Sequence, residues 1–397
     1  MEQIRLKSNQ LITASPSQFH RSIFSRIDIN ERLIGIMGAR GMGKTTLLLQ
    51  LAKSKFGVDP RALYINLDDI YFASKTLHQF ATEFRNKGGN HLFIDEIHKY
   101  PQWSVELKII YDTLPDLKVI FAGSSTIEMV KHYANLSKRA TIYNLPGLSF
   151  REYLAMQSIA DLPVIGLQSV LENHLQIGKE LDVDTNILMH FDRYLTRGYY
   201  PFSTENFELY KREMEQVIYQ TIESDLAYME GYDPHNAYKI RQLLSIIARN
   251  VPFKPNLVKI SELIGVHRNT LIGYFFHLEK AKLIQLLYPT GSIISILQKP
   301  QKVLLNNPNI AQLLCEPLPS RDSLMKTYIV NQIGSQYPIK LGINETIDVD
   351  GKWLLAIETS RKLSQKKYSL PNTYILADGT ELGNEKRIPL WMAGLGY

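Results

Sequence analysis

The chain has 397 residues, of which 45% are hydrophobic and 21% are charged. These fractions are typical of folded globular proteins and exclude a wholly disordered chain, and the length predicts two or three domains. The formal net charge of +6 permits contact with nucleic acid but does not demand it.

Two features indicate a cytoplasmic protein. The single cysteine, Cys315, excludes an internal disulfide and is typical of a reducing compartment. No apolar run approaches the roughly 18 residues of a membrane helix, and the first residues do not form a secretory signal. We therefore expect no contact with a membrane.

Residues 1–30 are polar, and we expect only a short helix near residues 19–27. The segment 38–45 lies between a predicted buried strand and a predicted helix, and it fits the pattern G-x-x-x-x-G-K-[ST] at every fixed position. Its glycines let backbone N–H groups turn toward phosphates, and the helix N-terminus adds partial positive charge. The predicted nucleotide-binding residues are Gly38, Ala39, Arg40, Gly41, Met42, Gly43, Lys44, Thr45 and Thr46. Lys44 would reach the β- and γ-phosphates, and the Thr45 hydroxyl would hold Mg²⁺.

A second signal follows the predicted strand 62–68 and the predicted helix 77–85. Residues 91–96 form an apolar strand that ends in the adjacent carboxylates Asp95 and Glu96. Most apolar runs that end in Asp-Glu are strands meeting solvent, but this one follows a phosphate-binding loop. We therefore expect Asp95 to hold the Mg²⁺ shell and Glu96 to polarise the attacking water.

Further candidates follow a predicted helix over 101–114. A strand over 117–125 ends in Ser124 and Ser125, either of which could sense the γ-phosphate, although an ordinary Gly-Ser turn explains them equally well. Arg139 precedes a strand over 141–145 and could stabilise transition-state charge in its own chain or in a neighbouring subunit. A surface arginine is the alternative. Together these segments predict an α/β fold with a parallel sheet that binds ligands at its carboxyl edge.

The stretches 38–45, 92–96, 121–125 and 148–154, with the Lys138-Arg139 pair, resemble a large family of bacterial and archaeal AAA+-type ATPases. The resemblance implies a P-loop NTPase sheet, ATP as the nucleotide, a winged-helix region and a restriction-endonuclease-like C-terminal domain. We expect an ATPase domain at 1–150, a helical lid at 151–236, a winged-helix-like domain at 237–297 and an α/β nuclease-like domain at 298–397. Lys138 stands where the family usually has glycine, which weakens the assignment of Arg139.

The predicted winged helix contains three helices with a tight turn at Gly265. Residues 258–287 hold four basic and two acidic residues, a net charge of only +2 with histidines neutral. The third helix carries Leu271, Tyr274 and Phe275 at positions that we expect to be exposed. Packing against another domain is therefore favoured over DNA readout.

In the C-terminal domain, a hairpin over 347–352 leads to a strand over 353–358. The family resemblance implies metal ligands at Asp348 and Glu358, with a lysine two residues after the glutamate. Ser360 occupies that position, and Lys326 replaces a common glutamate of the preceding helix. Both departures predict either that nuclease activity is lost and the site is vestigial, or that the site is rearranged. The run 361–367 is basic enough to contact nucleic acid or an acidic partner, but a solvated loop is the expected structure. The apolar end, 388–397, is expected to dock on this domain.

The leading hypothesis is a Mg²⁺-dependent ATPase whose nucleotide state moves its C-terminal half, as a molecular switch or small motor. The alternative is a nucleotide-gated regulator that binds DNA or a protein and turns over little ATP. An ATP-driven nuclease ranks third. The protein partner is unidentified, DNA binding is weakly supported, and a homo-oligomer remains open.

Overall fold

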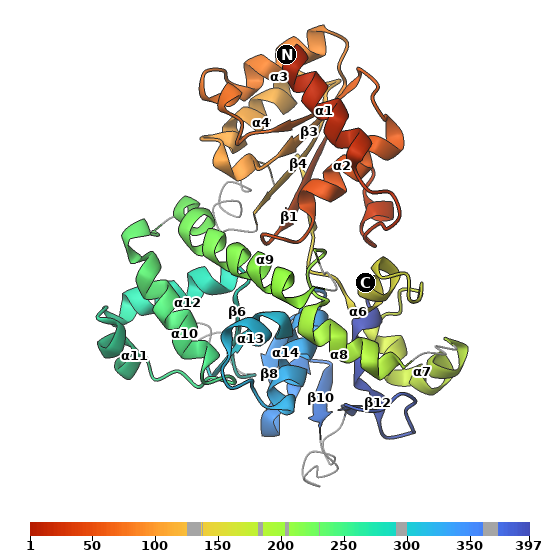
Figure 1. The fold of residues 1–397 in the computed structure, drawn as a ribbon, viewed down its shortest axis with the longest axis vertical. Coiled ribbons are helices and arrows are strands. Elements are labelled where there is room, and N and C mark those ends of the chain that lie inside the picture. Colours follow the sequence, from red (N-terminus) through yellow and green to blue (C-terminus); the bar gives the residue numbers. More distant parts are fainter. Residues whose placement is uncertain are drawn as a thin grey trace. The chain divides into compact units, whose positions relative to one another are not determined.

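The computed structural model describes residues 1–124, 136, 138–181, 186–202, 206–229, 231–290, 300–359 and 372–397. The chain divides into two compact units (Figure 1). The first contains Met1–Pro146 and Ser224–Tyr232, and the second contains Gly147–Glu223 and Asp233–Tyr397. The short segment 224–232 thus joins the first unit, although the chain on either side of it belongs to the second.

The first unit is built on a five-stranded sheet with the order β2-β3-β4-β1-β5. The strands are β1 (Leu33–Gly38), β2 (Ala62–Asn66), β3 (His91–Asp95), β4 (Lys118–Ser124) and β5 (Thr141–Asn144). Every neighbouring pair is parallel, which confirms the predicted α/β sheet. Because the strands are parallel, their carboxyl ends lie along one edge.

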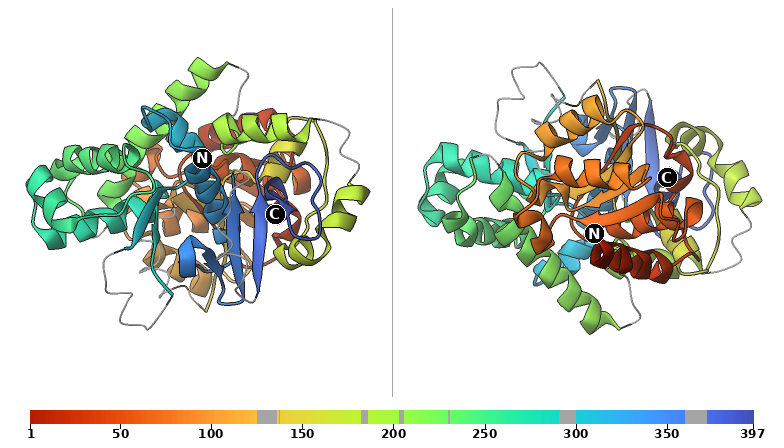
Figure 2. Two further views of the ribbon diagram at one scale, coloured as in Figure 1. Left: turned by 90° about the horizontal axis from the view of Figure 1, so that it is seen from below. Right: turned by 90° about the horizontal axis from the view of Figure 1, so that it is seen from above.

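Four helices accompany this sheet, namely α1 (Glu2–Ala14), α2 (Lys44–Lys55), α3 (Leu77–Asn86) and α4 (Trp103–Thr113). The prediction of an irregular start was wrong, because α1, the red helix in Figures 1 and 2, packs against β2 and α2. Its Ser8 hydroxyl accepts a hydrogen bond from the backbone N–H of Tyr64 at 3.0 Å, which satisfies a donor of the edge strand β2. The helix expected near 19–27 is reduced to one 3-10 turn, Phe24–Arg26.

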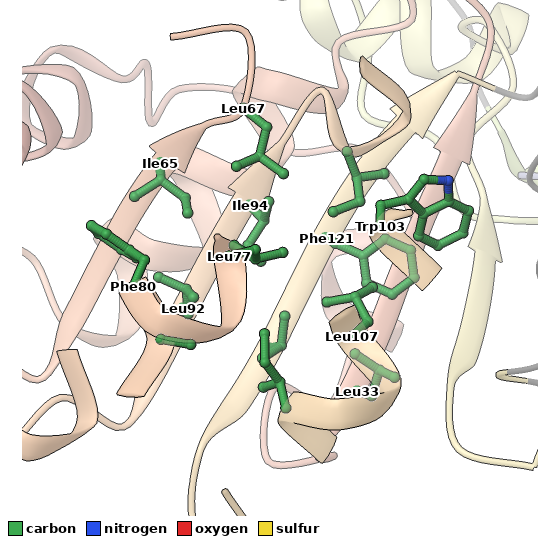
Figure 3. Close-up of a cluster of buried hydrophobic side chains, with 14 of the residues drawn as sticks. Leu33, Ile65, Leu67, Leu77, Phe80, Leu92, Ile94, Trp103, Leu107 and Phe121 are labelled. Carbon is green, nitrogen blue, oxygen red and sulfur yellow. The ribbon is translucent and has the colours of Figure 1, made fainter. Parts of the chain in front are cut away.

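An apolar cluster joins one face of the sheet to α3 and α4 (Figure 3). Phe80 and Leu77 of α3 lie with Ile94 in this cluster, and Trp103 of α4 packs its ring against Phe121 at 5.9 Å between centroids. These side chains are all buried. Each contributes about 1.5–3 kcal/mol of hydrophobic free energy, so the strands that carry the polar carboxyl edge are firmly anchored.

The second unit contains nine described helices. They are α6 (Phe150–Met156), α7 (Leu167–Glu180), α8 (Ile187–Arg197), α9 (Phe207–Gln220), α10 (Ala237–Ala248), α11 (Leu257–Ile264), α12 (Arg268–Lys280), α13 (Pro308–Leu314) and α14 (Arg321–Gly334). Helices α10, α11 and α12, coloured green to teal in Figure 2, pack on one another. The antiparallel strands β6 (Ile284–Leu287) and β7 (Lys302–Leu305) follow them. This is the element order that the winged-helix prediction requires, and the winged-helix identity itself stays a prediction.

The structure corrects the predicted exposed face of α12. Leu271, Tyr274 and Phe275 are only 0%, 4% and 2% exposed. They lie on the buried side of α12, while Ile272 and Phe276 are the large apolar side chains exposed on it. These three residues therefore do not support packing against another domain, whereas the low net charge of +2 that was the other reason is unchanged.

A second five-stranded sheet has the order β12-β11-β10-β9-β8. The strands are β8 (Ile339–Leu341), β9 (Ile347–Val349), β10 (Trp353–Glu358), β11 (Thr373–Ala377) and β12 (Ile388–Pro389). The predicted β9–β10 hairpin is confirmed as antiparallel, whereas β11 runs parallel to β10. The apolar end of the chain forms a buried turn, Leu390–Leu395, which packs against α6, α7 and α14, so the predicted docking is confirmed.

Within the described ranges, no helix combines the length and the apolar character needed to cross a bilayer.

Candidate functional site

The loop between β1 and α2 depends on its glycines. Gly41 and Gly43 have φ angles of +82° and +86°, in the region that side-chain-bearing residues avoid. A Cβ on Gly38 would lie 2.6 Å from the carbonyl oxygen of Leu145, just beyond β5. The glycine spacing of the motif is therefore a requirement of this backbone path, which ends at the N-terminus of α2.

Lys44, the first residue of α2, is buried inside this loop. Its Nζ donates hydrogen bonds of 2.9 Å to the carbonyl oxygens of both Gly38 and Ala39. Burial lowers the pKa of the Lys44 ammonium, and the charges of Glu96 and Asp95 oppose that effect. The lysine thus lies in the field of both predicted catalytic carboxylates.

Asp95 is the polar centre of the carboxyl edge. It ends β3, is 1% exposed, and accepts a 2.5 Å hydrogen bond from the Thr45 hydroxyl. The Tyr64 hydroxyl donates to the same carboxylate at 2.9 Å, and the backbone N–H of Glu96 donates to its other oxygen at 2.9 Å. Asp95 and Thr45, the two predicted Mg²⁺ ligands, are thus in direct contact. Hydroxyl and carboxylate oxygens are the ligands that Mg²⁺ prefers, so the pair fits this ion.

Glu96 follows Asp95 in a strained backbone conformation, with φ of +52°. Its Oε2 atom is buried and, among the described residues, has no hydrogen-bond partner. Burial raises the pKa of the Glu96 carboxyl, and the charge of Asp95 raises it further. A buried carboxylate oxygen without a hydrogen bond is destabilising, and such costs and strained conformations concentrate at functional sites.

His98 lies between Glu96 and the end of β4. Its Nδ1 accepts a hydrogen bond from the backbone N–H of Ser124 at 3.3 Å, which assigns the proton to Nε2. Nε2 is 3.5 Å from Glu96 Oε2. Burial lowers the pKa of His98 to about 4, so the ring is neutral at pH 7. The structure therefore brings Ser124 into the site through its backbone, whereas Ser125 lies outside the described residues.

Arg139 lies elsewhere in the unit. Its Nε and Nη2 atoms donate to the Asp112 carboxylate at 3.1 and 3.3 Å, and its guanidinium lies 5.7 Å from the centre of the Tyr111 ring. Arg32, which directly precedes β1, stacks on the same ring at 3.8 Å. Arg139 is thus near the amino ends of the strands, opposite the loop, and the structure does not bring it to the other predicted site residues of its own chain. Its catalytic role, in its own chain or in a neighbouring subunit, stays a prediction.

The loop residue Arg40 makes a contact that sequence reasoning did not find. Its Nε and Nη2 atoms donate to the two oxygens of Asp225 at 2.9 and 2.6 Å. Tyr228 belongs to the same segment as Asp225, residues 224–232, and its ring meets the His98 ring edge-on with 5.6 Å between the ring centres. Tyr64 and His98 were also missed. A histidine two residues after Glu96 is a recognisable signal, whereas the role of Tyr64 depends on the pairing of β2 with β3. Asp225 offers no local signal.

The predicted C-terminal metal ligands do not form one site. Asp348 pairs with Leu354 across β9 and β10, and Glu358 lies four residues further along β10. At about 3.3 Å per residue, the backbone positions of the two residues are about 13 Å apart along the strands, so their side chains do not lie opposite each other. Arg387 donates two hydrogen bonds, of 2.8 and 2.9 Å, to Glu358. The structure thus assigns the Glu358 carboxylate to an ion pair.

The neighbouring residues agree with this assignment. Asp348 accepts a hydrogen bond from the Gly351 N–H at 2.9 Å, and Lys326 pairs with Asp322 at 2.7 Å. No group of three or more His, Cys, Asp or Glu side chains that could hold a metal is found within the described ranges. Ser360, which replaces the expected lysine, lies outside those ranges.

Comparison with known proteins agrees with a nucleotide site at the loop between β1 and α2. Residues 30–154 match the family model of an AAA domain, and residues 188–316 match a domain of unknown function (DUF8612). An uncharacterized protein of Methanocaldococcus jannaschii is 28% identical in an alignment of 289 positions that covers 69% of this chain and 60% of that protein. The chain therefore spans less than two thirds of the length of this relative. The AAA match supports nucleotide binding and hydrolysis by the first unit.

Solved structures with similar folds include RuvB of Thermotoga maritima, with 15% identity and a TM-score of 0.28 over 72% of this chain and 89% of that chain. They also include AMPPCP-bound DnaA from Aquifex aeolicus, with 17% identity and a TM-score of 0.25 over 66% of this chain and 85% of that chain. Because both TM-scores are below 0.5, neither likeness bears on function.

Proposed function

We propose that this protein is a Mg²⁺-dependent ATPase whose nucleotide state changes the conformation of its C-terminal half. The observation that carries the proposal is the buried Glu96 oxygen that lacks a hydrogen bond, beside the Thr45–Asp95 pair and the glycine loop. An acceptor at this position is suited to a water molecule that attacks a phosphate.

Each side chain has a separate task in this mechanism. The loop N–H groups and the N-terminus of α2 bind the phosphates, and Lys44 exchanges its two loop carbonyls for phosphate oxygens. Thr45 and Asp95 would hold Mg²⁺, which neutralises phosphate charge when it is bound. Glu96 accepts the proton of the attacking water, and the Nε2–H of His98 faces Glu96 and restricts its orientation.

Phosphate release at saturating ATP and Mg²⁺ tests this assignment. Glu96→Gln keeps the shape of the side chain but removes the base, so we expect kcat to fall at least a hundredfold while ATP binding persists. Glu2→Gln changes an exposed glutamate of α1 and serves as the matched control, with kcat unchanged. Equal rates for wild type and Glu96→Gln would show that Glu96 is not the base.

A nucleotide-gated DNA-binding regulator is the second candidate. It is favoured by the burial of Leu271, Tyr274 and Phe275, because the first turn of α12, from Arg268 to Thr270, is exposed and polar. Very low turnover together with ATP-dependent retention of duplex DNA would support this candidate over the ATPase. The separated positions of Asp348 and Glu358 argue against an ATP-driven nuclease.

A further inference from the structure

Resting on the proposed ATPase function, the geometry points to Asp225 as a positioning residue that fixes the side chain of the loop residue Arg40 as a cation of this chain's own site, in addition to Lys44. The two groups form a two-pronged ion pair, Nε to Oδ2 at 2.9 Å and Nη2 to Oδ1 at 2.6 Å. A planar guanidinium bound through two parallel hydrogen bonds has a defined direction as well as a defined place.

This pair differs from a surface ion pair in its burial. The Asp225 side chain is 3% exposed and the Arg40 side chain 22%. Exposed ion pairs hold their side chains weakly, whereas a buried carboxylate requires its partner because it has lost the solvation of water. Asp225 therefore keeps Arg40 in one orientation, and Arg40 in turn compensates a negative charge that would otherwise repel phosphate.

The Arg40 guanidinium acts on the same site as the catalytic groups. Its hydrogen bonds to Asp225 raise its pKa most, and the charges of Glu96 and Asp68 raise it further. Arg40 and Glu96 both also act on the charge of Lys44. A fixed cation among these groups is placed to stabilise charge that develops on a transferred phosphoryl group. Arg139 lies near the amino ends of the strands, and the structure does not bring it to these groups.

The segment 224–229 contacts the site at a second point. The Tyr228 ring lies edge-on to His98, whose Nε2 faces Glu96. The segment begins in a π-helical turn, Thr221–Asp225, after α9, and such turns occur frequently at functional sites. One short segment thus reaches both the loop arginine and the histidine beside the catalytic base.

The test separates binding from turnover in the full-length chain. Asp225→Asn keeps the side-chain shape but removes the charge, and we expect kcat to fall at least tenfold while ATP affinity stays within threefold of wild type. Arg40→Lys keeps the charge, loses the two-pronged geometry and leaves no unpaired buried carboxylate. It should show the same split between kcat and affinity, and the double variant should be no slower than the slower single variant.

Asp59→Asn is the matched control, because Asp59 forms a two-pronged pair with Arg61 in the same unit with both residues solvent-accessible. Its kcat should stay within twofold of wild type. If Asp225→Asn does not fold, Arg40→Lys decides alone. Wild-type kcat in a folded Arg40→Lys or Asp225→Asn variant, even with a lower melting temperature, would reduce the pair to a structural role and overturn the inference.

A binding measurement keeps this result distinct from a failure of the proposed ATPase. If the wild type shows no phosphate release that depends on Glu96, the proposed function fails. The inference is then decided by the affinity for ADP with aluminium fluoride relative to ADP alone. We expect the wild type to bind ADP with aluminium fluoride more tightly than ADP alone. In Asp225→Asn the ratio of these two affinities should be at least tenfold smaller. Equal preferences, or no preference in the wild type, overturn the inference.

Discussion

Three donors converge on the single carboxylate of Asp95, and they come from three different elements. Thr45 belongs to α2, Tyr64 to β2, and the N–H of Glu96 to the turn after β3. The motifs were enough to predict that Thr45 and Asp95 meet, because the loop hydroxyl and the carboxylate at the end of the later apolar strand were both expected to hold the same Mg²⁺ ion. Tyr64 was missed because its role depends on β2 lying beside β3, which only the sheet order reveals.

We expect Tyr64→Phe to weaken the response to Mg²⁺. The substitution removes a buried hydrogen bond to Asp95. Only the hydrogen bonds from Thr45 and from the Glu96 backbone then orient the Asp95 carboxylate. Loss of such a supporting hydrogen bond typically costs about tenfold or more in metal affinity. The measurement is the Mg²⁺ concentration that gives half-maximal ATPase rate. Tyr143→Phe removes an exposed hydrogen bond to the Arg26 carbonyl oxygen in the same unit and should leave this concentration unchanged. An unchanged value for Tyr64→Phe would contradict the assignment.

At the scale of elements, apolar runs predicted the strands well because parallel strands are buried on both faces. The same reasoning failed for α1, in which only Ser8 and Ile12 of 13 residues are buried. It also placed the wrong side of α12 toward solvent, although Leu271, Tyr274 and Phe275 have the i, i+3, i+4 spacing of a buried helix face. The elements were thus predictable where burial is continuous and were not where one narrow stripe is buried.

Gly35 in the middle of β1 gives a test of sheet packing. A Cβ at this position would lie 2.4 Å from Ile142 Cδ1 and 2.8 Å from Phe121 Cζ, on β5 and β4. We expect Gly35→Ala to lower the free energy of unfolding by about 1–3 kcal/mol, as overpacking typically does. Denaturant titration followed by tryptophan fluorescence measures the change, because Trp103 lies in the first unit and Trp353 and Trp391 lie in the second.

Gly273→Ala is the control for this comparison. Gly273 lies inside α12, and no atom lies within 4 Å of an added Cβ. Alanine is favoured over glycine in a helix interior by about 0.5–1 kcal/mol, so this variant should be as stable as wild type or slightly more so. A Gly35→Ala protein that is as stable as wild type would mean that the side chains around β1 have room to move.

At the scale of the whole molecule, the composition of the first unit was not predictable from the sequence, and the four-domain division stays a prediction. The segment 224–232 contains no motif, and its Asp225 lies 185 residues from its partner Arg40. The loss of nuclease activity that Lys326 and Ser360 indicate stays a prediction. The separation of Asp348 from Glu358 along the strands was not predicted, because it depends on the register between β9 and β10. Contacts between distant parts of the chain are therefore what the structure adds.

The whole protein should lose stability as the pH falls from 6.5 toward 4. Burial lowers the pKa of His91 and of His98 to about 4 in the folded chain, and it also lowers the pKa of His190 and of His277. Between the unfolded value of 6.5 and the folded value, the unfolded chain binds protons that the folded chain does not, so acid favours unfolding. Each unit of pKa difference is worth about 1.4 kcal/mol.

His91 provides the variant that isolates this effect, because it is buried against Phe56 and carries no role in the proposed reaction. His91→Gln keeps a polar side chain beside Asn90, which contacts the ring nitrogen at 2.7 Å, and removes the titrating group. Its urea midpoint should fall less steeply than that of wild type between pH 7.5 and 4.5. His235→Gln, at an exposed histidine, should follow the wild-type slope. Parallel slopes for His91→Gln and wild type would mean that His91 takes up its proton in the folded chain as readily as in the unfolded one.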